Sequence, residues 1–219
     1  MNGSNRVSKG KKYELQISKD MSKAFKTNVS RTPMSGSWRG SNNDYNNHED
    51  NRFLGDLFFP LNHPMNIFNI ELKNHADIKL RSFFINSSRV QEFMNQVVTD
   101  AHRKDGYSVP ILICKVSRED NYLVIPYQDD FYNNLIKNEY PAQRLMLTNK
   151  DKMNKSINRY DCILTNLKSF MKFSVKDLTT WYKDVDWDKL NTNIKIEDDS
   201  EDEIVSALSA ISHIKKDTD

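Results

Sequence analysis

The sequence predicts an α/β fold, in which helices flank a mixed central β-sheet and a helical extension follows at the C-terminus. Short apolar runs typical of strands alternate with longer stretches of helical periodicity along the chain. The hydrophobic share of 37% is enough for a core, and 219 residues allow one domain of about 150 residues with an appendage. We place the first domain at residues 1–140 and the helical extension, with its acidic segment, at 141–219.

The first expected element is a helix at residues 6–26. Tyr13, Ile17 and Met21 recur at helical spacing and form a stripe that faces the core. Glu14 shares a face with Ile17 and Met21, at the edge of the buried stripe. It is either an ordinary boundary residue or a carboxylate directed at a site. The lysines of this helix, Lys9, Lys11 and Lys12 among them, mostly point outward.

A short, partly β-branched segment at 28–33 is followed by a loop at 36–52. This loop is rich in Gly, Asn, Ser and charged residues, and Trp38 is one of its few large apolar residues. Long loops in compact domains are usually functional or disordered. The pair Trp38-Arg39 could stack on bases or grip a phosphate, as aromatic and Arg side chains do on nucleic acids. A flexible insertion is the alternative.

Two apolar runs at 54–59 and 67–73 flank a Pro-containing turn and predict a β-hairpin. Asp56 interrupts the first run, and Glu71 and Lys73 interrupt the second. Side chains alternate along a strand, so Glu71 and Lys73 lie side by side on one face, where Asp56 can join them. Ionisable groups inside apolar strands are rarely buried unless they are paired or hold a metal.

The elements after the hairpin follow from apolar runs and helix caps. In order, they are a strand at 78–85, a helix from 88 to about 105, strands at 109–116 and 121–126, and helices at 131–136, 174–182 and 200–214. The order of helix, strand, hairpin, strand, helix, strand, strand indicates a mixed sheet with helices on its faces.

The formal net charge of +2 conceals an asymmetry along the chain. Residues 1–160 hold 24 Lys and Arg against 17 Asp and Glu, a balance of +7, and residues 161–219 hold 8 against 13, a balance of −5. A basic face suits a polyanion, because binding it releases condensed counterions. A solvated lysine-rich helix is the alternative. The acidic run at 197–203 is either a solvated tail or a competitor for the basic face.

Several classes of protein are not expected. No apolar stretch approaches the ~18 residues of a membrane span, and the basic, polar N-terminus lacks the apolar region of a signal peptide. Cys114, Cys162 and the scattered histidines form no ligand cluster, so no disulfide framework or zinc site is expected. We therefore expect a cytoplasmic protein without a membrane partner, in the host cytoplasm if the Lys, Asn and Asp richness reflects a viral genome.

The spacing of Asp56 and Glu71-x-Lys73 resembles the core motif of the PD-(D/E)xK nucleases. Read with its surroundings, the chain resembles the Holliday junction resolvases of the archaeal and phage type within that superfamily, over about residues 5–127. The motifs that carry the resemblance are Glu14, Arg31-x-Pro33-x-Ser35-Gly36, Gly55-Asp56, Glu71-Leu72-Lys73, and Phe84 to Gln91, which resembles the family's strand leading into a Gln-bearing helix.

The resemblance implies a restriction-endonuclease-like fold and a homodimer whose two Mg²⁺-dependent sites nick opposed strands of a four-way DNA junction. Carried over by position, the metal ligands are Glu14, Asp56 and Glu71, the catalytic lysine is Lys73, and Arg31 and Ser35 lie near the scissile phosphate. The residues expected to contact DNA are Lys9, Lys11, Lys12, Arg31, Ser35, Trp38, Arg39 and Gln91.

Mg²⁺ binds through a few carboxylates and relieves charge on a phosphate during hydrolysis. Asp56 and Glu71 fit as direct ligands, the Leu72 carbonyl could complete the protein's share, and Glu14 would bind directly or through water. Lys73 could orient the attacking water or stabilise the developing charge. Mn²⁺ is expected to substitute for Mg²⁺.

The chain departs from the resolvase pattern in three places. Nineteen residues separate Gly36 from Asp56, a Gly rather than a Pro precedes Asp56, and residues 145–219 have no counterpart. Two alternatives therefore stay open beside the junction resolvase. One is a repair or restriction-like nuclease with another DNA target, and the other is a DNA-binding structural protein whose Glu-x-Lys forms a surface salt bridge.

Overall fold

The computed structural model describes residues 3–32, 54–104, 108–116, 119–151, 156–187 and 194–195. The loop expected at 36–52, the acidic run at 197–203 and the helix expected at 200–214 lie outside the described residues. Within the described ranges, no helix is both long and apolar enough to cross a bilayer.

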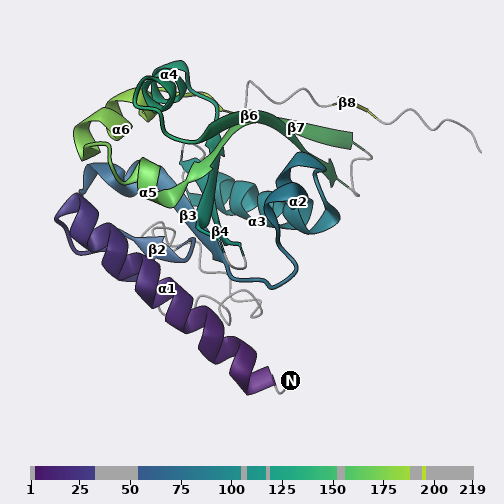
Figure 1. Cartoon of the computed structure of the whole chain (residues 1–219), viewed down its shortest axis with the longest axis horizontal. Coiled ribbons are helices and arrows are strands. Elements are labelled where there is room, and N and C mark those ends of the chain that lie inside the picture. The colour runs from purple at the N-terminus through teal and green to yellow at the C-terminus, as the bar shows by residue number, and fades with distance from the viewer. Residues whose placement is uncertain are drawn as a thin grey trace, which may run out of the picture.

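A mixed β-sheet forms the centre of the molecule (Figure 1), as predicted. Its strands lie in the order β1 (Ser30–Arg31), β2 (Leu57–Phe58), β3 (Phe68–Lys73), β4 (Val109–Lys115), β5 (Asn121–Pro126), β7 (Ser156–Asn166) and β6 (Ala142–Asp151), with β8 (Ile194–Lys195) paired to β7. Strands β3 and β4 run parallel, whereas the other pairs of described strands are antiparallel.

The helices are α1 (Gly3–Phe25), α2 (Leu80–Phe84), α3 (Ser88–Lys104), α4 (Asp129–Lys137), α5 (Leu167–Phe170) and α6 (Val175–Tyr182), and a 3₁₀ turn, η3, spans Pro64–Ile67. Helix α3 lies on the connection that a parallel pair such as β3 and β4 requires. The stripe expected on the first helix is confirmed, because Tyr13, Ile17 and Met21 are buried.

Helices α1 and α3 lie on opposite faces of β3 and β4. Lys73 is paired in register with Cys114 and reaches Gln96 of α3, with Lys73 Nζ 2.8 Å from Gln96 Oε1. Lys115 is the next residue along β4 and therefore points to the other face. There its ammonium nitrogen lies 5.9 Å from the centroid of the Tyr13 ring in α1.

The hairpin predicted at 54–73 is present. Strands β2 and β3 pair antiparallel with Leu57 opposite Ile70, and η3 occupies the turn. His63 precedes η3, and its Nδ1 accepts a hydrogen bond of 3.2 Å from the backbone N–H of Met65. This contact fixes the connection between β2, which Asp56 directly precedes, and β3, which carries Glu71.

The strand expected at 78–85 is wrong, because residues 80–84 form α2. Ile78 and Phe83 are buried, whereas Phe84 and Ile85 are more than half exposed. The run Phe83-Phe84-Ile85 therefore does not enter the sheet, and its hydrophobicity alone was misleading.

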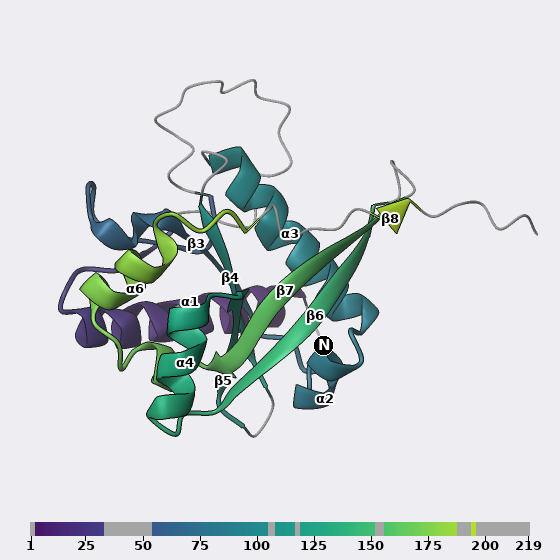
Figure 2. The same ribbon diagram turned by 90° about the horizontal axis from the view of Figure 1, so that it is seen from above.

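Residues 142–151 and 156–166 form two long strands that were not predicted, so the sheet continues past residue 140. Figure 2 shows β6 and β7 as a long ribbon with β8 at its far end. Helices α5 and α6 follow, where a helical extension was expected. They pack against the sheet, since the Phe68 ring of β3 lies 6.1 Å from that of Phe170 and 5.6 Å from that of Tyr182.

Candidate active site

Asp56 lies where β2 and β3 begin to pair, and it bonds to β3 through both its backbone and its side chain. Its N–H donates to the Ile70 carbonyl at 2.7 Å, and its Oδ2 accepts from the Leu72 N–H at 2.8 Å. The Asp56 carboxylate thus accepts the hydrogen bond that a carbonyl of a neighbouring strand would otherwise accept from the Leu72 N–H. The N–H and C=O of one strand residue point to the same edge, so the Leu72 carbonyl faces the side on which Asp56 lies.

Gly55 is required directly before Asp56. Its φ of +92° lies in the left-handed region that Gly adopts without penalty. A Cβ at this position would lie 2.7 Å from Asn69 Oδ1 and 2.9 Å from the Ile70 carbonyl oxygen. Pro is fixed near a φ of about −65° and cannot adopt this conformation. The Gly found where the resolvase pattern has Pro therefore has a structural reason.

Glu71 and Lys73 lie on one face of β3, as the alternation predicts. Glu71 is only 2% exposed, and Lys73 Nζ lies 2.6 Å from Glu71 Oε1. Lys73 Nζ also lies 5.2 Å from the centroid of the Phe93 ring on α3. The ammonium group is thus held between a buried carboxylate and an aromatic ring.

Gln96 of α3, which is not among the predicted site residues, completes this group. Its Oε1 accepts from Lys73 Nζ at 2.8 Å, and its Nε2 donates to Glu71 Oε1. The Gln singled out from the sequence, Gln91, instead donates to the Asn86 carbonyl at 2.8 Å. In the sequence, Gln96 could have been noticed as a polar residue at the edge of the apolar stripe predicted for the helix that begins at residue 88.

In addition to burial, the charge of Glu14 of α1 raises the pKa of Asp56. Glu14 Oε2 lies 3.0 Å from Arg31 Nη1 of β1, and both side chains are partly buried. The Ser18 hydroxyl of α1 donates to the Val29 carbonyl at 2.7 Å and so holds the start of β1 against the helix. Arg31, which was expected near the scissile phosphate, thus forms an ion pair with Glu14, and its contact with a phosphate stays a prediction.

Burial and the neighbouring carboxylates act together on Asp56. Burial, the Glu71 carboxylate and, to a smaller extent, the Glu14 carboxylate raise its pKa from 3.8 to about 7. The hydrogen bond from Leu72 and the charge of Lys73 act in the opposite direction. Asp56 therefore lies in a field of like charge, which a cation would relieve.

This donor set fits a hard divalent cation. Its members are carboxylate and carbonyl oxygens, which Mg²⁺ prefers, and their mutual repulsion favours a positive ion between them. In the described residues, however, no three Asp, Glu, His or Cys side chains are already arranged to hold a metal ion. The carboxylates are instead engaged by Leu72, Lys73, Gln96 and Arg31. Their role as ligands stays a prediction.

The residues expected to contact DNA are placed only in part. Lys9, Lys11 and Lys12 are exposed on α1. Ser35, Trp38 and Arg39 lie outside the described residues. For these residues, as for Gln91, a contact with DNA stays a prediction.

Comparison with known proteins gives one family. A family model described as "Phage putative PDDEXK endonuclease" matches residues 5–180, which include α1, the hairpin and α6. No curated protein and no solved structure matches the chain.

Proposed function

The chain belongs to this family of phage PDDEXK endonucleases, and on that premise we propose that it hydrolyses phosphodiester bonds in branched DNA with the help of Mg²⁺. The family makes the chain a nuclease that acts on DNA. The proposal adds the metal ion, the site residues and the class of DNA, a four-way junction in the first place.

One observation carries the proposal: Lys73 is held 2.6 Å from a Glu71 carboxylate that is only 2% exposed. A surface salt bridge in a structural protein would leave both partners in water. Here Asp56 is also only 8% exposed, and its pKa is raised by burial and by Glu71. Groups in such an environment are typical of catalytic sites.

The roles of the residues follow from this geometry. Asp56, Glu71 and the Leu72 carbonyl would hold the ion, with Glu14 approaching from α1. The ion would relieve the negative charge of the phosphate during hydrolysis. Lys73 would orient the attacking water or stabilise the charge that develops on the phosphate. Gln96 fixes the Lys73 ammonium group beside Glu71.

Two further observations support DNA as the substrate, and the first of them supports branched DNA. The order of Glu14, Arg31 to Gly36, Asp56 and Glu71-Leu72-Lys73 resembles that of junction resolvases. The balance of +7 over residues 1–160 suits an extended contact with phosphates. Nicking both opposed strands of a junction requires two sites, so we propose a homodimer as the active form.

Cleavage assays test the proposal directly. The protein is incubated with a four-way junction, a splayed-arm DNA and a linear duplex, each with Mg²⁺, with Mn²⁺ or with EDTA. We expect cleavage of the junction with either metal and none with EDTA. Asp56→Asn should abolish it and Lys73→Ala should slow it by about 100-fold or more, whereas the exposed controls Asp184→Asn and Lys172→Ala should cut like the wild type. Absence of metal-dependent cleavage of every DNA would overturn the proposal.

The same panel separates the DNA targets. Paired nicks in the junction support a resolvase, and sedimentation should then show a dimer at the protein concentration of the assay. Cleavage of the linear duplex at one sequence would instead indicate the restriction-like alternative. A monomer that nicks only one strand of the junction would contradict the paired mechanism.

A further inference from the structure

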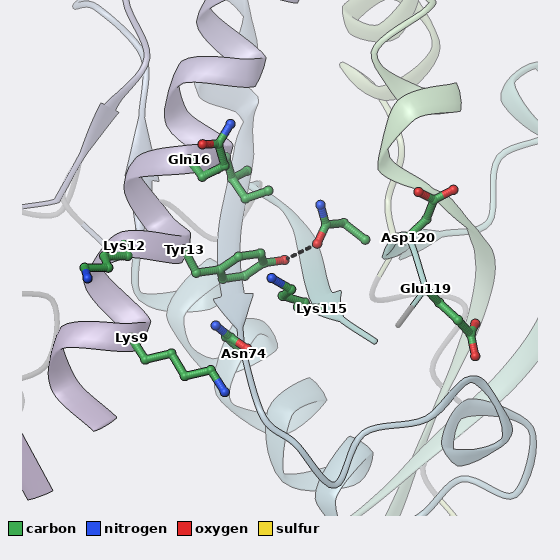
Figure 3. Close-up of a pocket in the computed structure, with 10 residues that line it drawn as sticks. Lys9, Lys12, Tyr13, Gln16, Asn74, Lys115, Glu119 and Asp120 are labelled. Carbon is green, nitrogen blue, oxygen red and sulfur yellow. Dashed lines mark hydrogen bonds between the residues drawn. The ribbon is translucent and has the colours of Figure 1, made fainter. Parts of the chain in front are cut away.

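An open pocket of about 400 Å³ lies between the first half of α1 and the ends of β3 and β4 (Figure 3). Tyr13 and Ile17 of α1 line its base, and Asn74 and Lys115 come from the ends of the two strands. The other lining residues are Lys9, Lys12, Gln16, Glu119, Asp120 and Asn121. Nothing in the catalytic group described above uses this pocket.

The charged groups of the pocket are segregated. In Figure 3, Lys9, Asn74 and Lys115 gather beside the Tyr13 ring, whereas Glu119 and Asp120 lie on the other side of the Tyr13–Asn121 hydrogen bond. Asp120 is neutralised by Lys168, whose Nζ lies 2.5 Å from Asp120 Oδ1. The side next to α1 therefore presents positive charge and amide groups, which suit a phosphate and a base edge.

The pocket begins one residue away from the candidate active site at two points. Tyr13 directly precedes Glu14 in α1, and Asn74 directly follows Lys73 in β3. Lys73 faces α3, whereas Asn74 lines the pocket on the α1 face. A DNA strand that passes round the end of β3 would thus move from the proposed cleavage site into the pocket.

The size of the pocket restricts what can enter. A volume of about 400 Å³ is at the small end of the range for sites that hold one small ligand, roughly 300–1,000 Å³. A single nucleotide fits such a space, but a base pair within a stacked duplex does not. A nucleotide that enters must therefore be unpaired already, or must leave its stack at a cost in free energy.

We propose that this pocket binds one unpaired nucleotide of the DNA substrate, next to the phosphate that is cleaved. Lys9 and Lys115 contact its phosphate groups, and the Asn74 amide contacts the base edge. This inference rests on the proposed function and deepens it: the enzyme selects DNA in which a strand leaves the duplex near the cut, such as a branch point or a flap. Continuous duplex is disfavoured because it offers no unpaired nucleotide.

Binding without metal tests the pocket separately from catalysis. Fluorescence anisotropy in EDTA compares a blunt duplex with a DNA of the same sequence whose ends are splayed into unpaired arms. The wild type should bind the splayed DNA more tightly. Lys115→Gln and Asn74→Ala should each weaken splayed-arm binding by roughly tenfold and duplex binding by less than about twofold. Lys115→Gln should also reduce the salt slope by about 0.7, the value for one single-strand phosphate.

The exposed Lys172→Gln is the matched control and should bind both DNAs like the wild type. Lys115 is also exposed, and thermal melting should show that its substitution leaves the fold intact. If the variants lose affinity equally for both DNAs, or for neither, the proposed role of the pocket is wrong, even if the wild type cuts branched DNA. If they lose affinity for the splayed DNA alone and the wild type cuts no DNA, the role of the pocket is supported and only the proposed cleavage is wrong.

Discussion

Gln96 Oε1 lies 2.8 Å from Lys73 Nζ, so a helix and a strand that are 23 residues apart in sequence hold one ammonium group in place. The same Gln96 side chain donates to the Glu71 carboxylate. It therefore bridges the two members of the Glu-x-Lys motif from outside the strand. A long, flexible lysine held in this way loses little further entropy when it acts on a phosphate.

Replacing Gln96 by Ala should slow cleavage by roughly tenfold, because Lys73 loses the partner that positions it. The DNA affinity should stay the same, since Gln96 contacts Lys73 and Glu71. Single-turnover rates at saturating DNA, with affinities measured in EDTA, separate the two effects. The exposed Gln143→Ala is the control. A loss of affinity with an unchanged rate would contradict this role.

Lys73→Ala should reduce the rate of cleavage by about 100-fold or more, the usual effect of removing one group that stabilises a transition state. The melting temperature should fall, because Glu71 is only 2% exposed and keeps Gln96 but loses its cation. Rates with Mg²⁺ and melting curves check both statements. Cleavage by Lys73→Ala at the rate of Lys172→Ala would show that Lys73 is not catalytic.

Gly55→Ala should destabilise the protein by about 1–3 kcal/mol or more and misplace Asp56. The added Cβ would clash with Ile70 backbone atoms, and φ would stay at +92°. Gly10→Ala is the matched control. Its nearest new contact would be Glu14 Oε1 at 3.9 Å, and Ala in a helix should stabilise by about 0.5–1 kcal/mol. Urea unfolding measures both, and equal free energies of unfolding would exclude the strain at Gly55.

The metal-free protein should lose stability as the pH rises from about 4 to about 7. Burial and the Glu71 carboxylate raise the pKa of Asp56 to about 7, so the folded state binds a proton that the unfolded state releases near pH 3.8. The contribution is complete below the lower pKa and lost above the higher one. At about 1.4 kcal/mol per pKa unit, the loss is at most roughly 4 kcal/mol.

The pH effect can be isolated by substitution. Unfolding in EDTA at pH 5 and pH 8 should show a steeper loss for the wild type than for Asp56→Asn, which has no proton to release. Asp184→Asn, an exposed aspartate, should follow the wild type. Parallel pH profiles for the wild type and Asp56→Asn would contradict the raised pKa.

Mg²⁺ should stabilise the wild type, because an ion that binds the folded state alone shifts the equilibrium. At 100 times the dissociation constant this is about 2.7 kcal/mol, or roughly 5–10 °C in Tm. Asp56→Asn and Glu71→Gln should lose most of the shift, and Asp184→Asn should retain it. Differential scanning fluorimetry with Mg²⁺ measures this without any DNA. An equal shift in all variants would place the ion elsewhere.

The sequence alone was sufficient for the local part of the site. Asp56, Glu71 and Lys73 were found because alternation along a strand fixes which side chains share a face, and ionisable residues inside apolar runs are conspicuous. The stripe of α1, the hairpin and the order of β3, α3, β4 and β5 followed from the same local periodicities. These features depend on residues that are close in the chain.

The tertiary structure decided what depends on distant residues. Gln96 could be distinguished from Gln91 only once α3 was packed on β3, because both are polar residues on one helix. Strand β6 escaped detection because it lies at the sheet edge and much of it is exposed, so its apolar signal is weak. Strand β7 is an inner strand whose residues 162–165 are buried, so its apolar run was available in the sequence. The pKa of Asp56 and the pocket between α1 and the ends of β3 and β4 arise from charges and surfaces that only folding brings together.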